Sequence, residues 1–178
     1  MGKEAMRILT ETILLKFRDH DNWIYQVSRS GAKLQELEHE FKRYLEEKRR
    51  VLGNVFLDEG VNYIWTALCG GSFTPFDAAN AHIGVGDGTE SEDPSQTGLT
   101  GTNKYYKSMD TGYPTYGSDR LATFRATFGA DEANFAWNEW TVANGPGDEY
   151  INLNRKQESL GTKTQGSTWI LTVQLRIV

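Results

Sequence analysis

Residues 167–178, STWILTVQLRIV, decide the fold class of this 178-residue chain. Successive residues alternate between two faces, and one face is wholly apolar. That face carries Trp169, Leu171, Val173, Leu175 and Ile177. Strict alternation over this length predicts a half-buried β-strand with one face in a core.

Further strands are predicted upstream. Residues 120–128, RLATFRATF, alternate in the same way, and residues 134–143, NFAWNEWTVA, form a strand with a bulge before Trp140. Shorter strands are expected over 81–86 and 149–153, and residues 87–103 are expected to form a long polar loop. Twelve of the 18 glycines fall between residues 70 and 147. This pattern predicts a mainly β protein with a β-sandwich or barrel-like body over 54–178.

Residues 1–53 differ in character from that body. Residues 1–50 carry 11 basic and 9 acidic residues, whereas 51–178 carry 8 and 15. Residues 7–17 and 23–27 favour two strands joined by the turn Asp19–Asn22, although 7–17 also fits a helix. We therefore expect an N-terminal hairpin followed by a charged helix, together forming an attachment or oligomerisation segment.

The expected helix covers residues 32–50, AKLQELEHEFKRYLEEKRR, which contain no Gly, Pro or β-branched residue. Its apolar positions recur at coiled-coil spacing. They are Leu34, Leu37, Phe41 and Tyr44, with Leu45 widening the stripe. This stripe is the candidate interface for a homo-oligomer, with a trimer favoured; packing on the chain's own domain is the alternative.

A second helix is predicted over residues 58–68, with Asp58 as its N-cap. Four apolar side chains share one face at helical spacing. They are Val61, Ile64, Trp65 and Leu68. Cys69 follows and is expected to be a small buried apolar residue.

Composition excludes several function classes. One cysteine cannot form a disulfide framework or a CxxC-type zinc site, and a net charge of −5 argues against nucleic-acid binding. The sequence has no transmembrane run and starts without the apolar core of a signal peptide, which predicts synthesis in a cytoplasm. The three histidines have no ligand spacing, and GxSxG is absent. We expect no enzyme activity and no cofactor.

Two features of the 84–93 region bear on ligand binding. Residues 84–88, GVGDG, resemble a phosphate loop, but the required third glycine is replaced by Thr89 and no helix follows. A glycine turn with positive φ is the preferred interpretation. Acidic residues gather just beyond and are weak candidates for a cation site, with a solvated acidic loop as the alternative. They are Asp87, Glu90, Glu92 and Asp93.

Aromatic residues suggest two surface hypotheses. Trp137 and Trp140 beside acidic residues are compatible with a carbohydrate site, with Asp131, Glu132 and Glu139 as candidate carboxylates. Tyrosines among glycines favour protein contacts, with ordinary loop packing as the alternative. They are Tyr105, Tyr106, Tyr113 and Tyr116.

Several segments of the body resemble segments found in a known class of proteins. They are NVFLDEGVNYIW (54–65), FDAANAHIGVGDGT (76–89), ANFAWNEW (133–140), LNRK (153–156), LGTKT (160–164) and STW (167–169), with a T-x-L step at 97–99. Over about 70% of the chain the sequence resembles virion structural proteins of tailed bacteriophages.

That resemblance implies a non-enzymatic virion component. It favours a head decoration or cement protein that binds the major capsid protein or other virion proteins. A tail, collar or fibre component is the alternative within the class, and a carbohydrate-binding receptor module is the alternative from another class. The resemblance also implies a homo-oligomer located in the virion.

Overall fold

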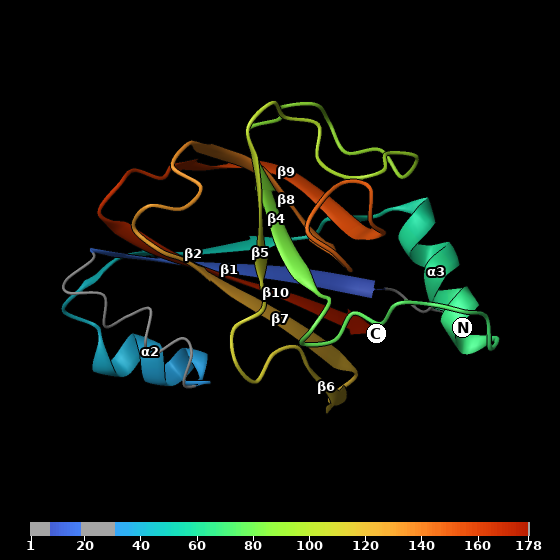
Figure 1. Ribbon diagram of the computed structural model, residues 1–178. Coiled ribbons are helices and arrows are strands. Elements are labelled where there is room, and N and C mark those ends of the chain that lie inside the picture. Colours follow the sequence, from blue (N-terminus) through green and yellow to red (C-terminus); the bar gives the residue numbers. More distant parts are fainter. Residues whose placement is uncertain (1–7, 19–30, 178) are drawn as a thin grey trace, which may run out of the picture.

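The computed structural model describes residues 8–18 and 31–177, and it places them in two antiparallel five-stranded sheets (Figure 1). The first sheet has the order β2-β1-β10-β7-β6 and the second has the order β3-β9-β8-β4-β5. Each sheet ends in two different edge strands, so the architecture is a sandwich and not a closed barrel. The expected mainly β, sandwich-like body is confirmed.

The strand bounds follow. The first sheet contains β1 (Ile8–Arg18), β2 (Leu45–Leu52), β6 (Thr115–Ser118), β7 (Leu121–Phe128) and β10 (Ser167–Ile177). The second contains β3 (Val55–Phe56), β4 (His82–Gly86), β5 (Lys104–Ser108), β8 (Ala136–Ala143) and β9 (Asn152–Thr162). The strands expected around β4, β7, β8 and β10 are confirmed. Of the short strand expected at 149–153, only residues 152–153 are strand, and they begin the longer β9.

The main core lies between the two sheets. Leu171 and Val173 of β10 and Phe124 of β7 contribute from one sheet, and Trp137 and Trp140 of β8 contribute from the other. These side chains are buried at the positions that the alternation predicts. The register of β8 against β9 shifts between Trp137 and Glu139, which confirms the expected bulge before Trp140.

The N-terminal segment is part of the sandwich. β1 pairs with β10 from Ile8↔Ile177 to Arg18↔Ser167, and its other edge pairs with β2. Residues 8–18 therefore form an inner strand, which corrects the expectation that residues 1–53 form an appendage. The expected turn at 19–22 and second strand at 23–27 lie outside the described residues.

The expected helix over 32–50 is mostly wrong. Only α2 (Leu34–Glu40) is helical; a turn follows, and Leu45–Leu52 is the edge strand β2. As a strand, this segment buries Val51 in the main core and places Arg50 against Glu11 of β1. Helix propensity differs by tenths of a kcal/mol per residue, so pairing with β1 and burial outweigh it.

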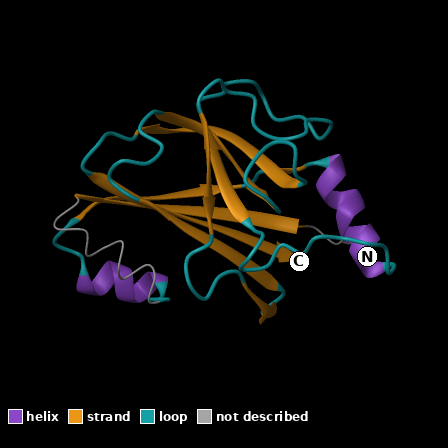
Figure 2. Ribbon diagram, in the orientation of Figure 1, coloured by secondary structure: helices purple, strands orange, loops and turns teal. Residues whose placement is uncertain are grey.

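The predicted second helix is confirmed as α3 (Asp58–Leu68), although Leu57 occupies the N-cap position and Asp58 is the first helical residue. The two helices lie at opposite ends of the sandwich (Figure 2). No helix among residues 8–18 and 31–177 is long and apolar enough to cross a membrane.

Candidate functional site

The predicted oligomerisation stripe packs inside the chain. Leu37 is fully buried against Ile13, Leu15, Phe17 and Ile170, on the face of the first sheet that points away from the main core. The other stripe residues are partly buried around the same cluster. They are Leu34, Phe41, Tyr44 and Leu45. The stripe therefore closes a second, smaller core, which corrects its assignment as an interface.

The acidic residues of the 87–103 loop bind different partners. Asp87 accepts hydrogen bonds from the side chain and backbone of Asn103, and the side-chain bond holds the pKa of Asp87 below its ordinary value. Burial favours a higher pKa for Glu92, but hydrogen bonds from Gln157 N and the Lys156 side chain outweigh it. Asp93 accepts from Ser95, whose hydroxyl lowers the pKa of Asp93. Glu90 contributes its backbone carbonyl to Arg155.

A cation site therefore has no support in this loop. Among the described ranges 8–18 and 31–177, no three His, Cys, Asp or Glu side chains are grouped so that they could hold a metal ion.

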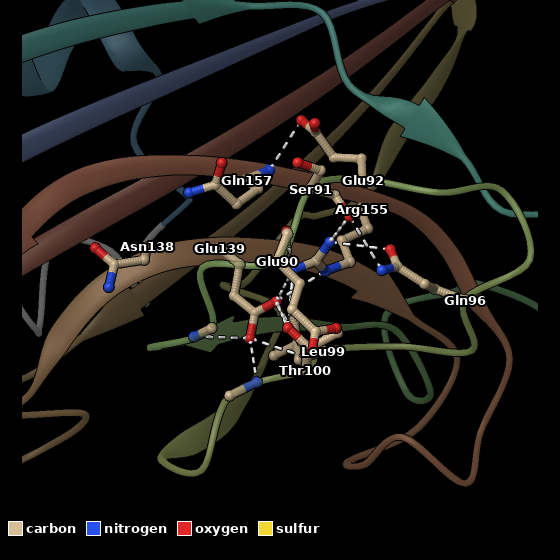
Figure 3. A network of polar contacts seen from close by, with 12 residues as sticks. Glu90, Ser91, Glu92, Gln96, Leu99, Thr100, Asn138, Glu139, Arg155 and Gln157 are labelled. Carbon is tan, nitrogen blue, oxygen red and sulfur yellow. Dashed lines mark hydrogen bonds and ion pairs between the residues drawn. The ribbon is translucent and has the colours of Figure 1, made fainter.

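The centre of this region is the ion pair of Glu139 and Arg155, whose side chains are fully buried (Figure 3). Glu139 accepts backbone N–H bonds from Gly88 (3.1 Å), Thr100 (3.0 Å) and Gly101 (2.7 Å). Arg155 Nε donates to Glu139 Oε2 at 2.8 Å. The pair fixes the 87–103 loop over the outer face of the second sheet.

Arg155 also donates hydrogen bonds to several other groups of the 87–103 loop. Its Nη atoms donate to the carbonyls of Glu90 and Ser91, to Gln96 Oε1 and to Thr100 Oγ1. Every polar end of the pair is thus bound to protein. The pair is a structural cross-link and presents no free acid or base.

The glycines in this region allow neighbouring groups to pack closely against the backbone. They do not form a turn with positive φ. Gly86 and Gly88 are absent from the positive-φ residues. A Cβ at Gly86 would lie 2.5 Å from Glu139 Oε1, and one at Gly88 would lie 2.4 Å from it. At Gly84 a Cβ would lie 2.5 Å from the Tyr106 ring. The positive-φ interpretation of 84–88 is therefore wrong, and the glycines let the loop reach the carboxylate.

The two tryptophans of the carbohydrate hypothesis do not lie at the surface, where a sugar could stack on them. Trp137 and Trp140 are fully buried in the main core, where their indole N–H groups donate to Ala133 O and Thr12 Oγ1. Glu139 is equally buried. The expectation that these residues form a sugar-binding surface is wrong.

The two remaining candidate carboxylates make other contacts. Asp131 accepts from Gln165 Nε2 at 2.8 Å. Glu132 accepts from Lys107, Tyr105 and the Gly129 N–H. Burial favours a higher pKa for Glu132, but the bonds from Lys107 and Gly129 hold it below its ordinary value.

Only one of the four proposed surface tyrosines is exposed. Tyr116 on the edge strand β6 is 79% exposed. Tyr106 donates to Asp148, and burial raises the pKa of its hydroxyl. Tyr105 donates to Glu132 Oε1 at 3.1 Å, and Arg125 lies over the Tyr113 ring, 4.2 Å from its centroid. For these three, ordinary packing is the correct interpretation.

The exposed apolar surface lies instead on α3, and we call it the α3 surface. It consists of the predicted helix stripe and one loop residue: Val61, Ile64, Trp65, Leu68 and Phe73. Trp65 is 61% exposed and Leu68 is 71% exposed. The helical spacing of the stripe predicts one apolar face and does not determine whether that face is covered. Cys69, expected to be buried, is exposed at the end of the helix.

The first turn of α3 explains this exposure. Leu57 is fully buried, and Gly60 packs so closely that a Cβ there would lie 2.6 Å from Leu153 O. Glu59 accepts the backbone N–H of Asn152 at 2.7 Å. These contacts attach the start of the helix to β9, and the following two turns project beyond the sheet edge (Figure 1).

Two apolar cavities adjoin the α3 surface, and Ile64 lines both. One, of about 610 Å³, lies between α3 and the β6–β7 turn and is lined by Phe56, Leu121, Phe124, Leu153 and Leu175 among others. The other, of about 220 Å³, lies between α3 and the loop that follows it, beside Tyr63, Phe73 and Phe76. The α3 surface and its cavities form the strongest candidate functional site.

Comparison with known proteins identifies no relative: no family model, no curated protein and no solved structure matches this chain.

Proposed function

We propose that this protein is a structural, non-enzymatic component of a tailed-phage virion. Within the virion we place it on the head as a decoration protein that binds capsid subunits and stiffens the shell. The proposal of this class is based on the segments of residues 54–178 that resemble virion proteins. The α3 surface is the single observation that carries a role in assembly, because exposed apolar patches of this kind mark protein contacts.

The chemistry of the interior favours a structural role. Glu139 is held by Arg155 and three backbone N–H groups, and Asp110 is held by Arg125 Nε and the Thr127 N–H. Catalytic acids and bases need free access to a reacting group. These buried charges hold loops in place, so they suit a protein whose function is rigidity.

Rigidity and contact together describe how such a protein would stabilise a shell. Its two cores and buried ion pairs keep the sandwich stiff, and the α3 surface supplies a contact with a neighbouring subunit. A unit that touches neighbouring shell subunits at once gains avidity from each additional contact. Deformation of the shell would then have to break several contacts together.

Immunogold electron microscopy of particles of the phage that encodes the chain tests this proposal. Gold on the heads is the expected result. Gold confined to tails, collars or fibres would replace the head assignment by the alternative within the class. Particles without any label, from cells that express the protein, would overturn the proposed function.

Co-sedimentation with empty heads gives a second test. The full chain should pellet with the heads, and the Trp65→Lys variant should pellet far less. Leu52→Lys provides a matched control, since Leu52 is 66% exposed and lies on β2, outside the residues of the α3 surface. Deleting residues 1–50 would not serve, because it would remove the inner strand β1.

A further inference from the structure

The occupant of the α3 surface can be inferred from its chemistry. Residues 60–76, GVNYIWTALCGGSFTPF, include most of the helix and the loop after it, and they contain no charged residue. This is the longest uncharged stretch in a chain that is 24% charged. A charged partner would find no complement on this surface, whereas an identical surface meets it without repulsion.

The pattern of the stripe suits a helix partner. Val61, Ile64, Trp65 and Leu68 recur at positions i, i+3, i+4 and i+7, the spacing that gathers apolar side chains on one face of a helix. We propose that α3 of one copy pairs with α3 of a second copy, antiparallel about a two-fold axis beside Ile64 and Trp65. This proposal rests on the proposed function only in taking the α3 surface as a subunit contact.

An antiparallel arrangement matches the side chains by size. With the axis at the centre of the stripe, the small Val61 of each copy faces the larger Leu68 of the other. The two Trp65 side chains pack across the axis. Such an interface is isologous, because the same patch serves both copies.

Electrostatics also selects this direction. α3 has acidic residues in its first turn, Asp58 and Glu59, and no basic residue in its last turn. A parallel pair would place the acids of both copies side by side. An antiparallel pair separates them by about 16 Å, the length of the helix, which exceeds the Debye length of about 8 Å. Antiparallel helix dipoles add a small attraction.

The available area is compatible with a real but weak dimer. The five side chains of the α3 surface are between 36% and 71% exposed, which offers on the order of 500 Å² of apolar area per copy. Standard interfaces bury about 800 Å² per partner. The rims of the two adjoining cavities supply further apolar surface that a second copy covers. We therefore expect micromolar pairing.

Light scattering and sedimentation of the full chain between about 5 and 200 µM test the pairing. The wild type should shift from monomer to dimer over this range. Trp65→Lys should weaken the dimer at least about 30-fold, the effect of losing a hot-spot side chain. Leu52→Lys introduces the same charge elsewhere and should dimerise like the wild type. Far-UV circular dichroism checks that both variants are folded.

Crosslinking through the native Cys69 tests whether the two α3 helices pair in an antiparallel orientation. In the antiparallel arrangement the two Cys69 residues lie roughly 13 Å apart along the axis, too far for a disulfide, whose Cα atoms lie within about 7 Å. Oxidation should leave the wild type uncrosslinked. The double variant Ile64→Cys, Cys69→Ser places a thiol beside the axis and should crosslink efficiently.

Several results would overturn the proposal. They are a wild-type monomer at every concentration, a dimer that Trp65→Lys leaves intact, and a wild type that crosslinks readily through Cys69. A monomer that still pellets with heads in a Trp65-dependent manner would show that another virion protein occupies the surface. The proposed function would then stand without self-pairing. A dimer that neither labels nor pellets with particles would leave pairing intact and overturn the function.

Discussion

Glu139 and Arg155 form a fully buried ion pair beneath the longest loop of the second sheet, with Arg155 Nη2 2.6 Å from Glu139 Oε2. They project from β8 and β9 on the side away from the main core (Figure 3). Because the carboxylate accepts three backbone N–H groups of the loop, one side chain replaces the regular hydrogen bonds that a loop lacks.

Replacing Glu139 by Ala should destabilise the protein by about 3–5 kcal/mol, because it leaves Arg155 buried and unpaired. Three loop N–H groups would lose their acceptor as well. Urea unfolding measures the change. Glu46→Ala, which removes an exposed partner of Arg18, is the matched control and should cost less than about 1 kcal/mol. Equal losses for both variants would contradict the role of the buried pair.

Replacing Gly88 by Ala should be more damaging than Gly53→Ala. At Gly88 the new Cβ would lie 2.4 Å from Glu139 Oε1 and 2.6 Å from the backbone nitrogen of Gly101, which cannot rotate away. Gly53 has φ +75° and open space around it, so Ala there costs only about 1–2 kcal/mol of backbone strain. Denaturant midpoints of the two variants provide the comparison. A Gly88→Ala variant as stable as Gly53→Ala would count against close packing at the carboxylate.

Leu37→Ala should lower the free energy of unfolding by about 2–5 kcal/mol, the range for truncating a buried leucine. It should leave the mass of the folded protein in solution unchanged, because Leu37 contacts Ile13, Leu15 and Ile170 of its own chain. Chemical unfolding combined with light scattering separates the two effects. A lower mass with unchanged stability would instead support the interpretation of this stripe as an oligomer interface.

Acid should destabilise the protein partly through Glu132. Burial opposes ionisation of Glu132, but the hydrogen bonds from Lys107 and Gly129 prevail and lower its pKa from the ordinary 4.5. A lowered pKa in the folded state stabilises the fold above the unfolded value, and this contribution is lost as pH falls through the folded value.

Glu132→Gln should therefore weaken the pH dependence of stability between about pH 5 and 3. Urea unfolding at several pH values measures the slope for both proteins. Identical slopes for the wild type and the variant would contradict this assignment.

Much of the fold follows from local pattern. Alternation placed β7, β8 and β10 and the face of each that enters the main core, because a strand with one buried face must repeat every two residues. Helix α3 followed from its apolar spacing in the same way. β5 and β6 were not predicted, since neither carries a strong alternation and β6 is exposed along its length.

The errors arose where two interpretations share one local pattern. Residues 45–52 have the composition of a helix, and only the free edge of β1 makes them a strand. The stripes beginning at Leu34 and Val61 both suit a core or an interface. The stripe beginning at Leu34 was assigned to an interface and packs in a core instead, because spacing alone does not determine how deeply a helix packs.

By itself the sequence determined a mainly β body of sandwich or barrel type, the absence of a recognisable catalytic or zinc motif, and a short amphipathic helix before the glycine-rich half. Tertiary structure alone decided which apolar stripe is covered. The turn at 41–44 and strand β2 hold α2 so that Leu37 packs on the first sheet, whereas α3 is attached by Gly60 and projects its remaining turns into solvent. The reason is physical: burial depends on what lies opposite a face, and those partners are distant in sequence.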